Sequence, residues 1–179
     1  ILDFSFFKQQ LIALILALIT YFIILHIDYR IIGILSKYIY IVGIIGLIIV
    51  FFIGVEARGS ARWLEIFGFR LQVSEVIKPF FLIFIAHFLS SSKSKSLMTY
   101  IKSILLFIPV FLLVLKQPDL GNALVYAASF GFMLIMYGFR PLYFFVTGLL
   151  VAIPVPLLYH TLHQYQKDRI TSFLDITHD

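Results

Sequence analysis

Long apolar stretches alternate with short polar ones along most of the chain. Six of these stretches approach the roughly 20 residues that a helix needs to cross a hydrocarbon core of about 30 Å. They lie at about 9–27, 38–54, 71–89, 99–115, 120–139 and 141–159. None shows the strict apolar and polar alternation of a barrel strand. Because a backbone in lipid must satisfy its own hydrogen bonds, the pattern predicts an all-α integral membrane protein, a polytopic bundle with six transmembrane helices in this sequence.

Composition supports a membrane protein. Of the 179 residues, 61% are hydrophobic and only 13% are charged, and the mean hydropathy is +1.03. A soluble domain carries charge on about a quarter of its residues. We therefore expect the lipid bilayer to be the main partner of this surface, and we treat residues 1–179 as a single transmembrane domain.

Other features exclude several classes of function. The chain has no cysteine, so it forms no disulfide and no thiolate metal site. The formal charge of +5 is dispersed, which predicts no nucleic-acid partner. His160 and His163 are close in sequence but lack a third ligand at fixed spacing, so we predict no metal site. The chain begins with Ile1 and ends in a polar stretch, and we expect it to be a piece of a longer protein.

The polar connections differ in character between the two predicted sides of the membrane. One side holds a short basic connection, a serine and lysine loop and a tight turn: residues 28–37, "SSSKSKS" at 90–96, and Arg140-Pro141. The other holds residues 55–70, the "KQPD" turn at 116–119 and the tail after Tyr159. Lysine and arginine are nearly equal on the two sides, so the positive-inside rule does not decide orientation. The acids gather on the second side, a weak indication that the serine and lysine loop is cytoplasmic.

The segment "GSARWLEIFGFRLQVSEVIKPFF", residues 59–81, interrupts two apolar runs with charged residues. The purely apolar part of the third span is too short to cross a bilayer, so the helix must recruit Glu75 and Lys78. Their three-residue spacing allows an ion pair on one helix face. A lysine near mid-helix costs on the order of 2.5–3.5 kcal/mol on insertion scales, and Pro79 frees a helical carbonyl beside it. The pair either serves function or fixes helix packing.

Three other residues in this segment or directly before it each have two interpretations. Trp63 could line a substrate site, or it could belong to an interfacial helix with Leu64 beside it. Arg58 and Arg62 are four residues apart and form a basic edge, which could hold a phosphate or face lipid headgroups.

The segment "KQPDLGNALVY" carries a second set of polar residues between two apolar spans. Pro118 disfavours a helical conformation for the residue before it, which predicts an extended Gln117. Asp119 is placed to cap the helix that begins near Leu120, where a carboxylate also suits the positive end of the helix dipole. A capping role is favoured over chemistry for Asp119.

Three blocks in this order resemble one family: "GSARWLEIFGFRLQVSEVIK", "KQPDLGNALVYAASFGFMLIMYG" and "YQKDRITSFLD". They are similar to the SEDS proteins, the RodA, FtsW and SpoVE group of peptidoglycan polymerases, with "HQYQKDRITSFLD" closer to the RodA branch. The resemblance implies about ten transmembrane helices in the bacterial inner (plasma) membrane. This sequence would then hold helices two to seven, with residues 55–70 and the start of a large loop, 160–179, outside the cell.

The resemblance also implies a reaction. The whole protein would join lipid II units into glycan strands, in cell elongation or division. An acceptor hydroxyl attacks the anomeric carbon and undecaprenyl pyrophosphate leaves, which requires a base and nearby cations. A class B penicillin-binding protein transpeptidase and a divalent cation are implied as partner and cofactor. Possible pyrophosphate contacts are Arg58 and Arg169. The residues expected in the substrate cavity are Arg62, Trp63, Glu75, Lys78, Gln117 and Asp119.

The sequence departs from the family pattern in two respects. Val73 stands where the family usually has a proline before "SE". The family's catalytic aspartate is expected beyond residue 179, and neither Asp175 nor Asp179 matches its position. An alternative function is a transporter or flippase of a lipid-linked cell-wall precursor, which needs no base. A third is scaffolding of a division or elongation complex, which leaves the Glu75 and Lys78 pair unexplained. A carboxylate at the family's position in the following loop would discriminate the enzyme from the transporter.

Overall fold

The computed structural model describes residues 4–57, 60–66, 69–117, 119–153 and 167. Six helices and three strands follow one another along the chain: α1 Phe4–Leu25, α2 Tyr29–Ile53, β1 Val55–Ala57, β2 Ser60–Ile66, β3 Phe69–Gln72, α3 Val73–Ser90, α4 Leu97–Lys116, α5 Leu120–Tyr137 and α6 Pro141–Ala152. The chain divides into two compact units, residues 1–35 and 36–179. Each unit is described by itself.

In the first unit, Asp28 starts helix α2. Its Oδ1 accepts a hydrogen bond from the backbone N–H of Arg30 at 2.8 Å, and its carbonyl oxygen accepts one from Ile31 N at 3.0 Å. A side chain that binds the free N–H groups of a first turn fixes where a helix begins. The prediction of a connection over residues 28–37 is therefore wrong, because Arg30 and Lys37 both lie within the helix.

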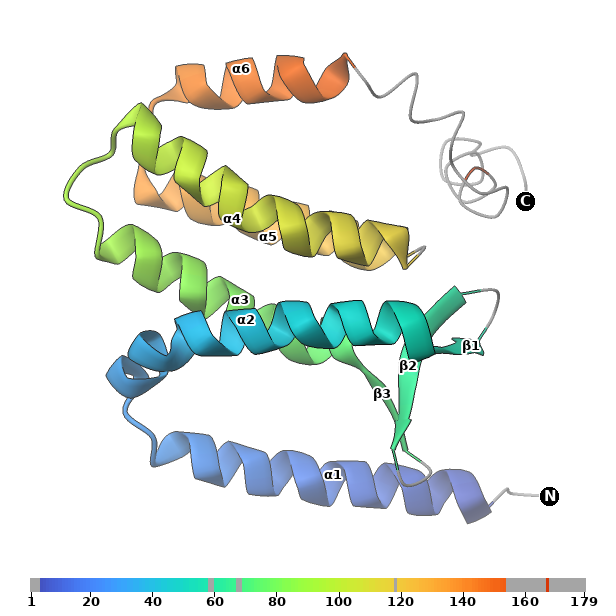
Figure 1. The fold of residues 1–179 in the computed structure, drawn as a ribbon. Helices are drawn as coiled ribbons and strands as arrows, with labels where there is room; N and C mark the ends of the chain where they lie inside the picture. Colours follow the sequence, from blue (N-terminus) through green and yellow to red (C-terminus); the bar gives the residue numbers. More distant parts are fainter. Residues whose placement is uncertain (1–3, 58–59, 67–68, 118, 154–166, 168–179) are drawn as a thin grey trace, which may run out of the picture. The chain divides into compact units, whose positions relative to one another are not determined.

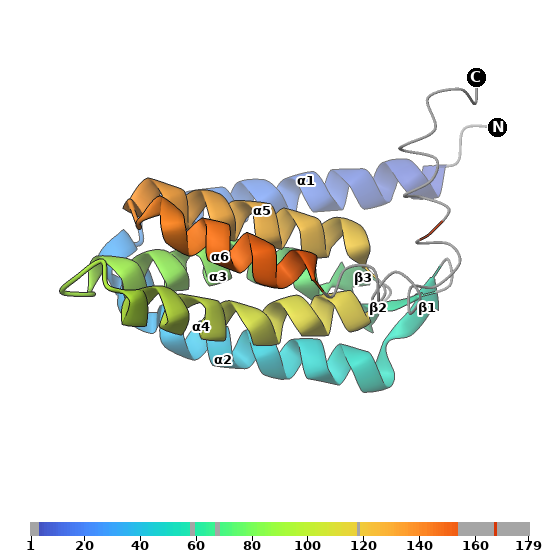
Figure 2. The same cartoon turned by 90° about the horizontal axis from the view of Figure 1, so that it is seen from above.

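In the second unit, the helices run lengthwise around an aromatic core. Figures 1 and 2 both show α3, α4 and α5 beside one another, with the three strands at one end of them. Phe81 of α3 is fully buried at the centre. Its ring centroid lies 5.6 Å from that of Tyr126, 6.1 Å from Phe107, and 6.4 Å from both Tyr40 and Phe130. Rings at these separations add to the stability that burial of their area supplies.

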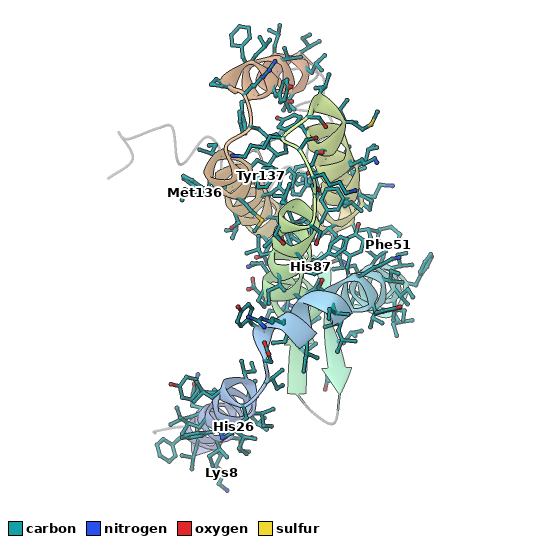
Figure 3. All side chains as sticks on the ribbon, turned by 90° about the vertical axis from the view of Figure 1, so that its left-hand side faces the viewer. Lys8, His26, Phe51, His87, Met136 and Tyr137 are labelled. Carbon is teal, nitrogen blue, oxygen red and sulfur yellow. The ribbon has the colours of Figure 1, made fainter. Side chains whose placement is uncertain are left out.

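The outer faces of these helices are apolar. Figure 3 looks along the helices and shows mostly carbon on the side chains that project outward, including Phe51 and Met136 on different sides of the unit. Met136 is 84% exposed and Phe51 is 50% exposed. Among the described helices, α2, α3, α4 and α5 are long and apolar enough to cross a membrane, and Gln10–Leu25 and Pro141–Ala152 are shorter apolar helices. The predicted class of a helical membrane protein is confirmed.

A three-stranded antiparallel sheet in the order β1-β2-β3 follows α2. Trp63 lies in β2, opposite Val55 of β1 and Gln72 of β3. The interpretation that Trp63 and Leu64 share an interfacial helix is therefore wrong, since consecutive strand residues point to opposite faces. Only two residues, Phe-Gly in sequence, join β2 to β3, and a connection of this length favours a hairpin over a helix.

Helices α2 and α3 approach each other closely at two glycines. A Cβ at Gly43 would lie 2.9 Å from Cγ2 of Ile77, and one at Gly46 would lie 3.2 Å from Cγ1 of Val73. Val73 is the first residue of α3 and is buried. The small glycine surface thus lets α3 pack against α2 and sets the position of the polar residues on the first turns of α3.

Candidate functional site

Five polar side chains form a continuous hydrogen-bonded chain at the end of the second unit where the strands lie. They come from β3, α3, the residue before α5 and the first turn of α5. We call this set the polar chain; its members are Gln72, Glu75, Lys78, Asp119 and Asn122. It joins segments that are far apart in sequence, because the bonds from α3 and β3 to the start of α5 span 44 and 47 residues.

Glu75 and Lys78 form the predicted ion pair. Lys78 Nζ donates to Glu75 Oε2 at 2.8 Å. The Lys78 side chain is only 18% exposed, whereas that of Glu75 is 52% exposed. At a rise of 1.5 Å per residue, Lys78 lies about 7.5 Å inside the start of α3. The pair therefore combines a largely enclosed ammonium with a carboxylate at the surface of the helix.

Lys78 has two further neighbours on α5. Its Nζ donates to Asn122 Oδ1 at 2.8 Å, and it lies 5.8 Å from the centroid of the Tyr126 ring. Tyr126 is fixed in turn, because its hydroxyl donates to the carbonyl oxygen of Ser74 at 2.7 Å. An ammonium over an aromatic face is stabilised by the ring quadrupole. Residues of two helices thus hold a side chain that would otherwise be flexible.

Asp119 caps α5, as predicted, and it also binds β3. Its Oδ1 accepts from Asn122 N at 3.2 Å. Its Oδ2 accepts from Asn122 Nδ2 at 2.9 Å and from Gln72 Nε2 at 2.7 Å. These three donors and the positive end of the helix dipole compensate the burial of the carboxylate, which is 5% exposed. Because its lone pairs are largely occupied, Asp119 is better suited to hold structure than to accept a proton from a substrate.

Gln117 is not part of the polar chain. It is 2% exposed, and its Nε2 donates to the carbonyl oxygen of Leu47 at 2.9 Å, which ties the end of α4 to α2. The predicted extended conformation is wrong, since Gln117 has φ −78° and ψ 26°. The reason is that its backbone N–H remains in the last helical turn, donating to Leu113 O at 3.1 Å and Val114 O at 3.2 Å.

Trp63 lies next to the polar chain. The side chains of the predicted arginines lie outside the described part of the structure. Directly opposite residues of an antiparallel pair project to the same face. Half-buried Trp63 therefore shares a face with Gln72, its partner in register. Arg62 lies in β2, but its side chain is outside the description, as are Arg58 and Arg169 altogether. The role of Arg62 in the substrate cavity and the roles of Arg58 and Arg169 as pyrophosphate contacts stay predictions.

The sequence reasoning missed Gln72, Asn122 and Tyr126. Asn122 and Tyr126 lie three and seven residues after Asp119, a spacing that places all three on one face of a helix. This periodicity could have identified them once Asp119 was assigned as the cap. Among the described residues, no group of three or more His, Cys, Asp or Glu side chains could hold a metal ion. His160 and His163 lie outside those residues.

Comparison with known sequences matches residues 2–179 to the FtsW/RodA/SpoVE family, described as cell cycle protein. The peptidoglycan glycosyltransferase MrdB of Escherichia coli K12 is 35% identical over 143 residues, which are 78% of this chain and 38% of MrdB. MrdB of Helicobacter pylori is 35% identical over 164 residues, 87% of this chain and 42% of that protein. An FtsW sequence from Coxiella burnetii is 34% identical over 177 residues, 96% of this chain and 47% of its own length.

Solved structures agree with these sequence matches. One chain from a peptidoglycan synthase complex that coordinates polymerization and crosslinking superposes with a TM-score of 0.84 at 28% identity, covering 99% of this chain and 53% of that one. The rod shape determining protein RodA of Thermus thermophilus gives a TM-score of 0.72 at 27% identity, covering 82% and 49%. The chain thus spans about half the length of these structures and less than half the length of the curated relatives described above.

Proposed function

The chain belongs to the FtsW/RodA/SpoVE family of multi-pass membrane proteins, and from this we propose that the full-length protein is a peptidoglycan glycosyltransferase of the bacterial inner membrane. It polymerises lipid II into glycan strands during cell elongation or division. The observation that carries the proposal is the polar chain. It places a held ammonium and a half-exposed carboxylate within the first turns of an apolar, membrane-spanning helix.

The chemistry of the reaction explains what such a site is for. The acceptor hydroxyl forms a bond to the anomeric carbon of the donor as the bond to the pyrophosphate oxygen breaks, and negative charge develops on the leaving group. A preorganised cation in a site of low dielectric stabilises that charge far more than it would in water. Lys78 supplies the cation in this chain. The base that takes the hydroxyl proton is expected beyond residue 179, which fits the holding role of Asp119.

Two further participants belong to the proposal. A class B penicillin-binding protein transpeptidase is the proposed partner, supported by the similarity to a chain from a synthase complex that couples polymerization to crosslinking. A divalent cation is the proposed cofactor. The described residues contain no group of three or more His, Cys, Asp or Glu side chains that could hold a metal ion, and no step of the reaction is derived through the cation.

Polymerisation by the purified full-length protein tests the proposal. The protein is assayed with lipid II and its cognate transpeptidase, with and without Mg²⁺, and glycan strands are separated on a gel. Moenomycin is included to inhibit contaminating glycosyltransferases that do not belong to this family. We expect wild-type polymer, and we expect Lys78→Met to lower the rate by about 100-fold, the scale of removing one preorganised charge-stabilising group.

Lys102→Met is the matched control. Lys102 is an exposed lysine of α4 outside the polar chain, so the same substitution there should leave the rate within about twofold of wild type, as surface changes usually do. Absence of polymer from the wild-type complex contradicts the proposal. If lipid II instead crosses liposome membranes in a Lys78-dependent manner, the protein is a transporter of the lipid-linked precursor.

A further inference from the structure

Asn122 uses both ends of its side-chain amide, and the chemistry of its two partners fixes which end faces which. Its Oδ1 accepts from Lys78 Nζ at 2.8 Å, and its Nδ2 donates to Asp119 Oδ2 at 2.9 Å. An ammonium can only donate, and an ionised carboxylate can only accept. One amide orientation satisfies both partners, and the flipped orientation would satisfy neither. Asn122 is therefore a rigid bridge between the two charged groups.

The bridge holds the ammonium without neutralising it. Glu75 also binds Lys78, but as a carboxylate it cancels the positive charge, and its side chain is 52% exposed. Asn122 is neutral, and it is held in turn by the cap of α5. The negative charge of Asp119 is offset by its three N–H donors and by the helix dipole. Asn122 thus holds Lys78 in place without adding a negative charge beside it.

We propose that Asn122 is a positioning residue that presents the Lys78 ammonium to the pyrophosphate of a lipid-linked substrate. Glu75 and Asn122 take two of its three hydrogens, and a phosphoryl oxygen takes the third or displaces the exposed Glu75 carboxylate. The ammonium sits on a stem of four carbons whose ordering costs about 2 kcal/mol of rotamer entropy. Asn122 and Tyr126 keep it ordered before the substrate arrives. This inference rests on the proposed function for the identity of the substrate.

Binding measurements on the full-length protein in nanodiscs test the role of Asn122 independently of turnover. The probes are a polyprenyl pyrophosphate and, for the lipid tail alone, the corresponding uncharged polyprenol. Asn122→Leu keeps the branched arrangement of side-chain heavy atoms and removes both side-chain hydrogen bonds. We expect it to weaken pyrophosphate binding by about tenfold, the scale of one charge-assisted hydrogen bond, and to leave polyprenol binding unchanged. Leu124→Ala, at an exposed position of the same helix, should bind both probes like wild type.

Asn122→Asp gives a readout that a merely structural role would not move. When protonated, this side chain reproduces asparagine, because its O–H donates to Asp119 and its carbonyl oxygen accepts from Lys78. When ionised, it repels Asp119 and neutralises Lys78. The affinity of this variant relative to wild type should therefore fall as pH rises. The wild-type measurement corrects for the titratable groups that both proteins share at this site, which are Glu75, Lys78, Asp119 and Tyr126.

The outcomes separate the inference from the proposed function. Pyrophosphate affinities of Asn122→Leu and Asn122→Asp that equal wild type at every pH overturn the inference, even if the wild-type protein polymerises lipid II. Wild-type binding with the expected variant effects but without polymer overturns the proposed function and upholds the inference. If the wild-type protein binds polyprenol and pyrophosphate equally, the Lys78 ammonium does not recognise the pyrophosphate and the inference is wrong, whatever the polymerisation assay shows. Should Asn122→Leu fail to fold, the pH series of Asn122→Asp decides.

Discussion

In the described part of the chain, the buried polar residues bind mainly one another and the backbone, which is how a membrane protein tolerates them. Gln117 donates to a carbonyl of α2, Tyr126 to a carbonyl of α3, and Gln72 to Asp119. Each bond avoids the cost of an unsatisfied polar group where no water competes. The same bonds fix the side chains around Lys78. The hydrogen bonds that stabilise the fold therefore also set the geometry of the site.

Ser74 is an exception among the described residues, and it leads to a stability prediction. Its side chain is 1% exposed, and its Oγ has no hydrogen-bond partner. An unsatisfied buried hydroxyl costs about 1–3 kcal/mol. We therefore expect Ser74→Ala to raise the free energy of unfolding by about 1 kcal/mol, with the Tyr126 bond to the Ser74 carbonyl intact. Unfolding in mixed detergent micelles measures the difference.

Ser103→Ala is the matched control for that measurement. Ser103 is also fully buried, but its Oγ donates to the carbonyl oxygen of Thr99 at 2.8 Å. Removing this satisfied bond should lower stability by about 1 kcal/mol. If Ser74→Ala is destabilising to the same degree, the Ser74 hydroxyl has a partner in the folded protein and the prediction is wrong.

Local interactions were predictable from the sequence, and contacts between elements were not. The Glu75 and Lys78 pair and the Asp119 cap depend on spacings of three residues, which helix geometry fixes. The Gln72 bond to Asp119 depends on where β3 ends relative to α5, and no local rule gives that register. Asn122 lies three residues after Asp119, so helix spacing alone could have identified it, but its bond to Lys78 depends on how α5 packs against α3. The polar chain could be predicted as separate pieces but not as a connected site.

Among the helices, caps and prolines decide where a helix begins, and hydropathy alone does not. Asp28 starts α2 ahead of its apolar run. Pro141 occupies the first turn of α6, where its missing N–H is not needed, so the predicted turn was correct. The sheet was not predicted because its strands have only three, seven and four residues, too few for the alternation of apolar and polar residues to stand out in a segment rich in charge. Backbone pairing there places Trp63 opposite Gln72.

The contact between α2 and α3 gives a prediction at this scale. Gly43→Ala would push a methyl group to within 2.9 Å of the branched Ile77 side chain. Overpacking of this kind costs about 1–3 kcal/mol, while alanine gains about 1 kcal/mol over glycine in a helix interior. We expect a net loss of up to about 2 kcal/mol, seen as a lower Tm of the detergent-solubilised protein.

Gly131→Ala separates the two contributions. Gly131 lies in α5, and nothing lies within 4 Å of a Cβ built there. This variant should gain the helix propensity without the clash, so its Tm should equal or exceed that of wild type. A Gly43→Ala protein as stable as Gly131→Ala would show that Ile77 moves aside at no cost, and that the glycine is not what sets the distance between α2 and α3.

In the molecule as a whole, the direction in which α3 crosses the membrane determines on which side the polar chain lies. The helix has 18 residues, about 27 Å at 1.5 Å per residue, which is close to the thickness of a hydrocarbon core. The polar chain lies at its amino end, next to the strands, and the serine and lysine loop follows its carboxyl end. The two ends must therefore lie at opposite faces of the bilayer.

The orientation of the protein in the membrane is predicted from the family resemblance and from the acids, because the two sides carry nearly equal numbers of lysines and arginines. We expect a cysteine at Glu65, an exposed residue of β2, to react with an impermeant thiol reagent in spheroplasts. One at Ser94, exposed in the serine and lysine loop, should react only after permeabilisation. This chain has no cysteine of its own to interfere. The opposite pattern would leave the fold intact but put Lys78 near the cytoplasmic face, where it could not take part in the proposed reaction outside the cell.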